Sequence, residues 1–118
     1  MAGRRRPVPG SRTGRPIMVL LDLLGQRWTL RVLWELREGA LTFRALQTAC
    51  DGVSPTVLSS RLAELRDADL VEHEDGVGYR LTRLGASLGA QLLELSHWAE
   101  AWAAERDGPP PSQGPPRR

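Results

Sequence analysis

The sequence predicts a mainly α domain that carries one small two-stranded antiparallel β-ribbon. Three observations support this fold class: leucines recur at helical spacing between residues 58 and 65, Ser54 and Pro55 mark a helix start, and two short apolar stretches flank a turn at 75–78. Residues 42–82 are therefore expected to form a short helix, a turn, a longer helix and two brief strands. The rest of the chain is organised around this unit.

Two helices are expected before this unit. The first should lie at about 17–24 and the second at about 27–37, with an interruption at Gly25 and a C-cap at Gly39. Their apolar residues recur at helical spacing, so the pair should lie mostly in the core. The residues concerned are Leu20, Leu24, Trp28, Val32 and Leu36.

A helix-turn-helix arrangement follows. Thr42 is predicted to cap a short helix that starts at Phe43, and Asp51-Gly52 marks a turn. Ser54 then caps the longer helix because its hydroxyl can accept from first-turn amides, and Pro55 loses no hydrogen bond at the first helical position. The inward-facing residues are expected to be Phe43, Leu46 and Ala49 on the short helix and Leu58, Leu62 and Leu65 on the longer one.

The outward side of the longer helix is small and polar, with Thr56, Ser59, Ser60 and Ala63. Large side chains or a run of carboxylates would keep a helix out of a DNA major groove roughly 12 Å wide. Hydroxyl groups and one arginine, Arg61, can instead approach base edges and phosphates. This side therefore fits a DNA groove, and the alternative is a plain solvated helix surface.

The ribbon and a last helix complete the domain. Strands are expected at 70–74 and 79–81 around the tight hairpin, and Thr82 is predicted to cap a helix at about 83–105. An apolar stripe on that helix is too long for so small a domain to cover, so a second copy of the chain should cover it. Dimerisation is assigned to Leu84, Leu88, Leu92, Leu95, Trp98 and Trp102.

Three phrases of the sequence carry a family resemblance. They are LDLLGQRWTLRVLWEL at 21–36, LTFRALQTACDGVSPTVLSSRLAELRDADLV at 41–71 and GYRLTRLGASL at 78–88. In this order they resemble the HxlR-type winged helix-turn-helix transcriptional regulators. The resemblance implies a winged helix-turn-helix that dimerises through its N- and C-terminal helices and binds double-stranded DNA as a repressor or activator.

The chain departs from this family's pattern at two places. Asp69 stands where the family usually has Gly before Leu-Val, and Asp tolerates a left-handed backbone less well than Gly. The wing is short, lacks the family's usual Arg near its tip, and carries Glu72, Glu74 and Asp75. We therefore expect phosphates to repel the wing unless Arg80 compensates.

The candidate DNA-contacting residues lie on the two central helices, at their caps and on the second strand. Arg44 and Arg80 can each touch phosphates, or can pair with Glu64 or Glu72, and both alternatives stay open. The full set is Thr42, Arg44, Ser54, Pro55, Thr56, Ser59, Ser60, Arg61 and Arg80.

The two ends differ in composition from the central part. We expect a flexible basic arm at 1–16, the DNA-binding and dimerisation domain at 17–106 and a disordered Pro-rich tail at 107–118. Ten arginines and thirteen acidic residues between positions 15 and 106 leave a charge of about −3 there, so attraction to DNA must come from local patches and the arm. The arm residues expected to contact DNA are Arg4, Arg5, Arg6 and Arg12, and an uninvolved solubilising tail is the alternative.

Four tryptophans and one cysteine invite a functional interpretation. The tryptophans are expected in the core or at an interface, and the alternative is a pocket for a small aromatic or hydrophobic effector. Some members of the resembled family sense oxidants through a Cys before a Pro at the start of the first helix, where this chain has Arg15-Pro16. Cys50 is instead expected to be a structural thiol. The candidate pocket residues are Trp28, Trp34, Trp98 and Trp102.

No enzyme, cofactor or metal site is expected. His73 and His97 lack ligand spacing, and no nucleophile–base or paired-carboxylate arrangement stands out. The longest apolar run, at 17–24, falls far below the ~20 residues that span a bilayer, and a single Cys fits a reducing compartment. We therefore predict a cytoplasmic protein without membrane contact.

These observations together predict a sequence-specific DNA-binding transcriptional regulator, a homodimer on a pseudo-palindromic operator. The alternative is a winged-helix protein-interaction module without specific DNA binding, which the acidic charge of the central part and of the wing favours. Binding to a specific DNA that weakens as salt rises separates the two.

Overall fold

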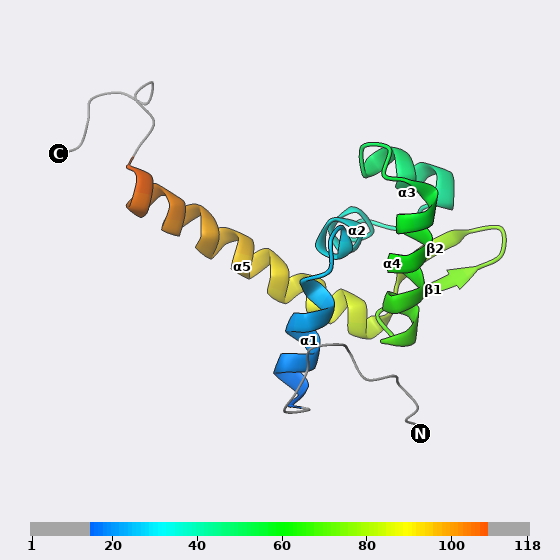
Figure 1. Cartoon of the computed structure of the whole chain (residues 1–118), viewed down its shortest axis with the longest axis horizontal. Helices are drawn as coiled ribbons and strands as arrows, with labels where there is room; N and C mark the ends of the chain where they lie inside the picture. Colours follow the sequence, from blue (N-terminus) through cyan, green and yellow to red (C-terminus); the bar gives the residue numbers. More distant parts are fainter. Residues whose placement is uncertain (1–14, 109–118) are drawn as a thin grey trace.

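The computed structural model describes residues 15–108 and folds them into five helices and one two-stranded antiparallel sheet (Figure 1). The elements are α1 (Pro16–Leu24), α2 (Thr29–Glu35), α3 (Phe43–Ala49), α4 (Pro55–Asp67), β1 (Val71–Glu74), β2 (Gly78–Leu81) and α5 (Arg83–Asp107). This arrangement confirms the mainly α fold with a small β-wing. The predicted arm contacts at positions 4–12 and the tail from 109 onward lie outside the described residues.

Helix α2 is shorter than predicted at both ends. It begins at Thr29 because Trp28 has a φ of 76°, a left-handed conformation that cannot continue a right-handed helix. It ends at Glu35 with Leu36 as the C-cap, so the prediction of a cap at Gly39 is wrong. Gly39 lies in the following turn, where its amide donates to the carbonyl of Leu36.

The predicted helix starts are confirmed by three hydroxyl caps. The side-chain oxygens of Thr42, Ser54 and Thr82 accept hydrogen bonds from the amides of Ala45, Val57 and Gly85 at 3.1, 3.2 and 3.0 Å. Each bond satisfies one of the first-turn amides that have no partner inside the helix. The polar residues in the sequence thus set where α3, α4 and α5 begin.

Helices α3 and α4 end in the same way, with an aspartate in the left-handed conformation. Asp51 has a φ of 60° and Asp69 a φ of 63°. In both cases the amide that follows turns back to a carbonyl in the last helical turn, from Gly52 to Gln47 and from Leu70 to Leu65. Asp69 therefore closes α4 without the glycine that the resembled family usually has.

The core lies between α2, α3 and α4. The three inward leucines of α4 are almost fully buried, as predicted, and Trp28 packs against the edge of the core. Helix α1 lies at the margin of the domain (Figure 1), and Leu23 is its one buried residue. The prediction of a mostly buried helix pair is therefore right for α2 and wrong for α1. The buried residues are Leu23, Val32, Leu33, Leu36, Leu46, Cys50, Val53, Leu58, Leu62, Leu65, Leu70 and Val71.

Helix α5 starts at the ribbon and then leaves the domain. A Cβ on Gly85 would come within 2.0 Å of the Leu70 carbonyl oxygen, so only glycine allows the first turn to lie this close to the start of β1. Beyond its first turns, α5 projects away from all the other elements (Figure 1). Across residues 15–108, none of the helices combines the length and hydropathy needed to cross a membrane.

The apolar stripe of α5 serves two surfaces instead of one. Leu88 and Leu92 are half-buried and pack against the core of their own chain, so their assignment to dimerisation alone is corrected. The other four predicted residues remain exposed, namely Leu84, Leu95, Trp98 and Trp102. Leu95, Trp98 and Trp102 are exposed because the second half of α5 projects beyond the domain, whereas Leu84 is exposed although it lies in the first turn, beside the ribbon.

Candidate nucleic-acid interface

The outward face of α4, formed by Thr56, Ser59, Ser60 and Ala63, is fully presented to solvent. All four residues are exposed and lie opposite the three buried leucines of the same helix. The side-chain hydroxyls on this face form no hydrogen bond with any part of the chain within 15–108. They are therefore available as donors and acceptors for a groove edge.

The caps of α3 and α4 are also open to solvent. Thr42, Ser54 and Pro55 are exposed, and the two hydroxyls each accept from a helix amide while keeping their own hydrogen to donate. Helix N-termini of this kind suit phosphate oxygens, because their amides point outward and carry partial positive charge. The predicted cap residues are therefore exposed and start their helices as expected.

Two arginines of the helix-turn-helix have guanidinium groups that no described residue engages. Arg44 in the first turn of α3 and Arg66 in the last turn of α4 are exposed, and neither forms an ion pair within the described part of the chain. Arg66 lies seven residues after Ser59, about two helical turns along the same side. Arg66 is not among the residues that the sequence predicted to contact DNA. Its exposure makes it a second candidate for a phosphate contact.

Arg61, in contrast, does not belong to the outward face. Its side chain is only 17% exposed, donates from Nε to the carbonyl of Arg27 at 2.7 Å, and pairs with Glu64 at 3.0 Å. The prediction of Arg61 as a DNA contact is therefore corrected, because its guanidinium is already held within the chain.

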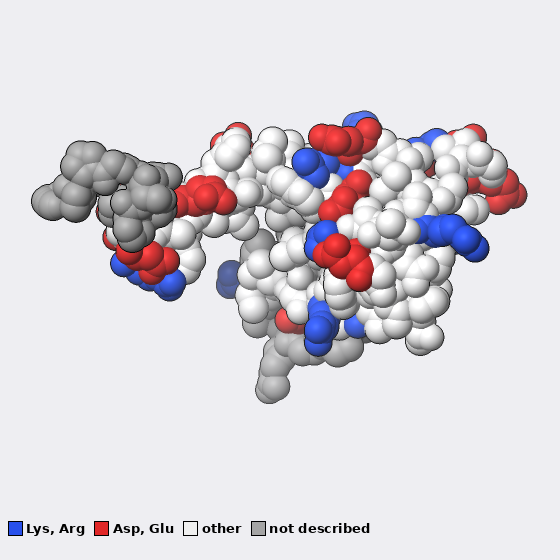
Figure 2. Space-filling view, turned by 90° about the horizontal axis from the view of Figure 1, so that it is seen from above, with Lys and Arg blue, Asp and Glu red and all other residues white. Residues whose placement is uncertain are grey.

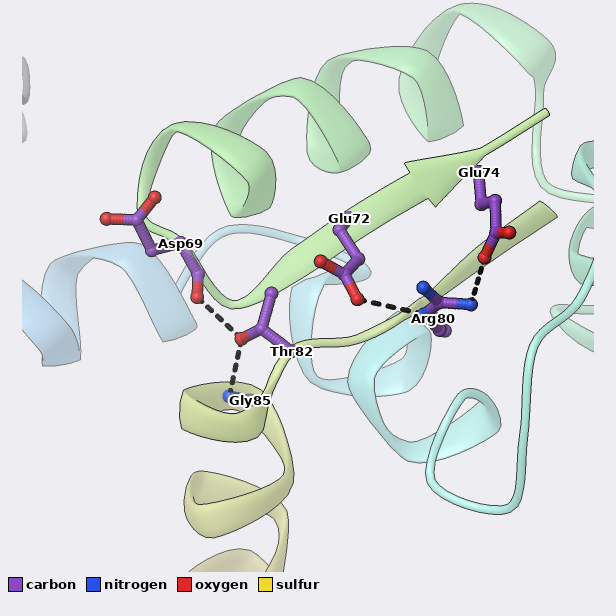
Figure 3. A network of polar contacts seen from close by, with 6 residues as sticks. All are labelled: Asp69, Glu72, Glu74, Arg80, Thr82 and Gly85. Atoms are coloured by element: carbon purple, nitrogen blue, oxygen red, sulfur yellow. Dashed lines mark hydrogen bonds and ion pairs between the residues drawn. The ribbon is translucent and has the colours of Figure 1, made fainter. Parts of the chain in front are cut away.

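Arg80 is engaged in the wing, the hairpin of β1 and β2 (Figure 3). Its Nε donates to Glu72 at 2.8 Å, and its Nη1 pairs with Glu74. The sequence left open whether Arg80 meets a phosphate or a carboxylate, and in this structure it pairs with two carboxylates of the wing. The hydrogen bond to Glu72, and then the one to Glu74, raises the pKa of Arg80. Arg80 thus remains charged, but its charge is cancelled locally.

Charge on the surface is mixed and the wing tip is acidic. On the face seen in Figure 2, basic and acidic side chains alternate without a continuous basic patch, and red side chains gather at the right-hand end, where Figure 1 places the hairpin. Glu72, Glu74 and Asp75 outnumber Arg80 there. The wing therefore repels a phosphate backbone.

Two helices present apolar side chains that nothing in the described chain covers. Helix α1 exposes Ile17, Met18 and Leu21, and the projecting half of α5 carries Leu95, Trp98 and Trp102. Trp98 is 60% exposed, and its ring stacks on that of Trp102 with centroids 6.1 Å apart. Large exposed apolar surfaces of this kind mark interaction sites in soluble proteins.

The four tryptophans do not converge within one chain. Trp28 packs on the core. The guanidinium carbon of Arg37 lies over the Trp34 ring, 3.9 Å from the ring centroid. Within residues 15–108 no ring contact joins either of them to the Trp98–Trp102 pair. Ring contacts within the described residues therefore do not join the four tryptophans into one cluster.

Cys50 lies in the core at the end of α3. It is fully buried, and burial raises the pKa of its thiol, which lowers the fraction of reactive thiolate at neutral pH. The sequence suggested a half-buried structural thiol, and the side chain is buried completely. No group of three or more His, Cys, Asp or Glu residues suited to a metal occurs in the part that the structure describes.

One long-range contact escaped the sequence reasoning altogether. Arg27 and Arg61 are 34 residues apart, and the acceptor is a backbone carbonyl. Neither periodicity nor a motif indicates such a bond. The left-handed conformation of Trp28, next to this carbonyl, could not be predicted either, because Trp28 fits the helical spacing of its neighbours.

Comparison with known proteins places this geometry in a family. Residues 23–107 match the family model described as HxlR-like helix-turn-helix. An uncharacterised HTH-type transcriptional regulator of Methanocaldococcus jannaschii, MJ0925, is 32% identical over 89 residues, which cover 72% of this chain and 83% of the relative. The HTH-type transcriptional regulator YodB of Bacillus subtilis is 30% identical over 92 residues, covering 73% and 82%.

Solved structures show the same similarity in three dimensions. The quinone-bound crystal structure of Bacillus subtilis YodB superposes with a TM-score of 0.67 at 30% identity, covering 72% of this chain and 96% of that one. A regulator from Enterococcus faecalis, described as belonging to the MarR family, superposes with a TM-score of 0.71 at 30% identity, covering 83% and 97%. The fold described above is therefore shared with known transcriptional regulators.

Proposed function

The chain belongs to the HxlR-like helix-turn-helix family of transcriptional regulators, and we propose that it binds a specific double-stranded DNA operator as a homodimer. The observation that carries this proposal is the outward face of α4. It is exposed, small and polar, and its hydroxyls are unengaged within the described chain. These properties let a helix approach the base edges of a major groove, as recognition helices do.

Phosphate contacts in this proposal come from the helix-turn-helix and not from the wing. Arg44 on α3 and Arg66 on α4 are exposed and form no ion pair within the described part of the chain, and the caps at Thr42 and Ser54 offer helix N-termini. Arg80 is held by two carboxylates of the wing, which keeps it from the backbone. The N-terminal arm, with its arginines at 4–12, supplies additional positive charge in this proposal.

The homodimer is supported by the uncovered apolar surface of α1 and α5. A two-fold pair would bury Ile17, Leu21, Leu95 and the Trp98–Trp102 stack. Two copies of α4 would then face half-sites about one DNA turn apart, which requires a pseudo-palindromic operator.

The direct experiment is capture of genomic fragments by the purified protein. We expect enrichment of a few fragments that share an inverted repeat, with binding that weakens as salt rises. Enrichment of no fragment over bulk DNA at any salt concentration would favour the alternative, a winged-helix module that binds another protein. The acidic wing is the feature that favours this alternative.

We further propose a flat hydrophobic effector that binds at the seam of the dimer. The stacked, exposed Trp98–Trp102 pair supports it, and the related YodB has a quinone-bound structure. The probe is anthraquinone-2-sulfonate, which is planar and does not alkylate thiols. Its binding should quench tryptophan fluorescence in the native dimer, and Trp98→Leu/Trp102→Leu should abolish saturable quenching. Saturable quenching that survives in this variant would exclude the stacked pair as the binding site.

A further inference from the structure

Arg61 is the one arginine of α4 that turns toward the body of the domain. Its guanidinium donates a hydrogen bond from Nε to the carbonyl of Arg27 at 2.7 Å and one from Nη1 to the carboxylate of Glu64 at 3.0 Å. The other carboxylate oxygen of Glu64 is buried and accepts no hydrogen bond from the described residues. Arg61 is therefore the group that compensates this carboxylate and joins α4 to residue 27.

The carbonyl that Arg61 holds belongs to a strained turn. Residues 25–28 connect α1 to α2, and the peptide that carries this carbonyl is the one before Trp28, whose φ is 76°. A bulky aromatic residue seldom adopts a positive φ and does so only when its surroundings enforce it. The Arg61 hydrogen bond fixes the orientation of that peptide plane, and the Trp28 ring packs on the core.

This turn lies between the two surfaces on which the proposed function depends. On one side is α1, whose Ile17, Met18 and Leu21 are exposed for a partner, and on the other is α4, whose outward face meets DNA. The structure assigns Arg61 the role of a positioning residue that ties α4 to the α1–α2 turn and so sets the distance between the two recognition helices of a dimer. This inference rests on the proposed function.

The test compares two variants that alter Arg61 with one variant that alters Arg66, all on α4 of the full-length protein. Arg61→Gln/Glu64→Gln removes the tie without leaving a carboxylate uncompensated, and Arg61→Lys keeps a positive charge but cannot present two N–H groups in a plane. Arg66→Gln is the matched control, because Arg66 is exposed on the same helix and unpaired within 15–108. Each protein is measured on operators with half-site spacing changed by one or two base pairs, and over a range of salt.

We expect Arg61→Gln/Glu64→Gln to bind the native operator about tenfold more weakly, a loss of about 1.4 kcal/mol. Its slope of log affinity against log salt should match wild type, because Arg61 touches no phosphate in this account, while its preference for the native spacing should flatten. Arg61→Lys should behave similarly. Arg66→Gln should show the reverse pattern, with a smaller salt slope and an unchanged spacing preference. A reduced salt slope in the Arg61 variants with an intact spacing preference would overturn the inference in favour of direct DNA contact.

Amide hydrogen exchange without DNA separates this inference from the proposed function. Exchange in the segment 26–29 should accelerate several-fold in both Arg61 variants and stay unchanged in Arg66→Gln, because Arg61 donates to the Arg27 carbonyl of this turn and Arg66 does not. Unchanged exchange in the Arg61 variants would overturn the positioning role even if wild-type protein binds its operator. Accelerated exchange in a protein whose wild type binds no specific DNA would keep the tie but overturn both the proposed function and the role of Arg61 in spacing.

Discussion

The outward face of α4 and the wing are both polar, both exposed and only a few residues apart in sequence, yet they differ in what they can offer a partner. The α4 face has no charge, and its hydroxyls are unengaged within the described chain. The wing has four charged groups, and its single guanidinium is held by two of its carboxylates. A side chain can bind a partner only when no other group of the chain already engages it, so the number of charged groups in a region does not by itself show what that region binds.

The register of the ribbon explains why Arg80 is unavailable. Glu72 lies directly opposite Arg80, and Glu74 is the next residue on the same face of β1 (Figure 3). Cross-strand neighbours at these positions are within reach of a long side chain. A wing built this way keeps an acidic excess, whereas α4 has no such neighbours on its outward side.

The largest effect should follow from placing the same carboxylate on each region in turn. Ser60→Glu puts it against base edges and phosphates, and specific affinity should fall by about 100-fold or more. Val77→Glu adds the same charge to the exposed wing tip and should leave affinity within about twofold. Band-shift titrations measure both, with circular dichroism as the check on folding. Equal reductions in affinity in the two variants would erase the distinction between the regions.

The next effect concerns the pairing of two α4 helices in a dimer. Leu95→Glu/Trp98→Glu should give a folded monomer by light scattering and at least tenfold weaker operator binding, because two charges replace exposed apolar side chains. Leu93→Glu is the matched control, since Leu93 is also exposed but lies about 200° around the helix from Leu95. A double variant that remains dimeric would remove α5 from the interface.

A smaller effect is expected from the N-terminal arm, because it would substitute for the wing. Deleting residues 2–12 should weaken operator binding and lower the slope of log affinity against log salt by up to about 0.9 for each phosphate that the arm neutralises in the intact protein. The secondary structure seen by circular dichroism should not change. If both affinity and slope survive the deletion, the arm takes no part in binding.

The smallest effect should come from releasing Arg80. In Glu72→Gln/Glu74→Gln the guanidinium loses both carboxylates, so the hydrogen bonds that raise its pKa weaken and its charge is free to meet a phosphate. Affinity should rise several-fold, and the salt slope should increase by about 0.9. Adding Arg80→Gln should cancel the gain. A gain that persists in the triple variant would have to come from the loss of negative charge alone.

The local structure of this protein could largely be predicted from its sequence. Caps at Thr42, Ser54 and Thr82 and the left-handed ends at Asp51 and Asp69 depend on residues three to five positions apart. Such interactions need only the chemistry of neighbouring residues. The helix-turn-helix and its outward face followed from these signals and from the leucine spacing.

The contacts that decide the roles of individual arginines could not be predicted in this way. Arg61 was assigned to DNA, and Arg80 was left open between a phosphate and a carboxylate such as Glu72. Their actual roles emerge only once α4 meets residue 27 and the two strands pair in register. The projection of α5 likewise splits a regular stripe, so that Leu88 joins the core and Leu95 does not. Periodicity shows that a face is apolar, but tertiary packing decides what covers it.

The most direct test of the central claim maps each region onto the operator by local cleavage. An iron chelate is attached to a cysteine introduced as Ala63→Cys on α4 or as Val77→Cys on the wing, and the native Cys50 stays unlabelled because it is buried. Hydroxyl radicals from the chelate on residue 63 should cut the operator strongly in two clusters about one helical turn apart, each across a major groove. The chelate on residue 77 should cut weakly or not at all. Strong cutting from residue 77 with none from residue 63 would contradict the account.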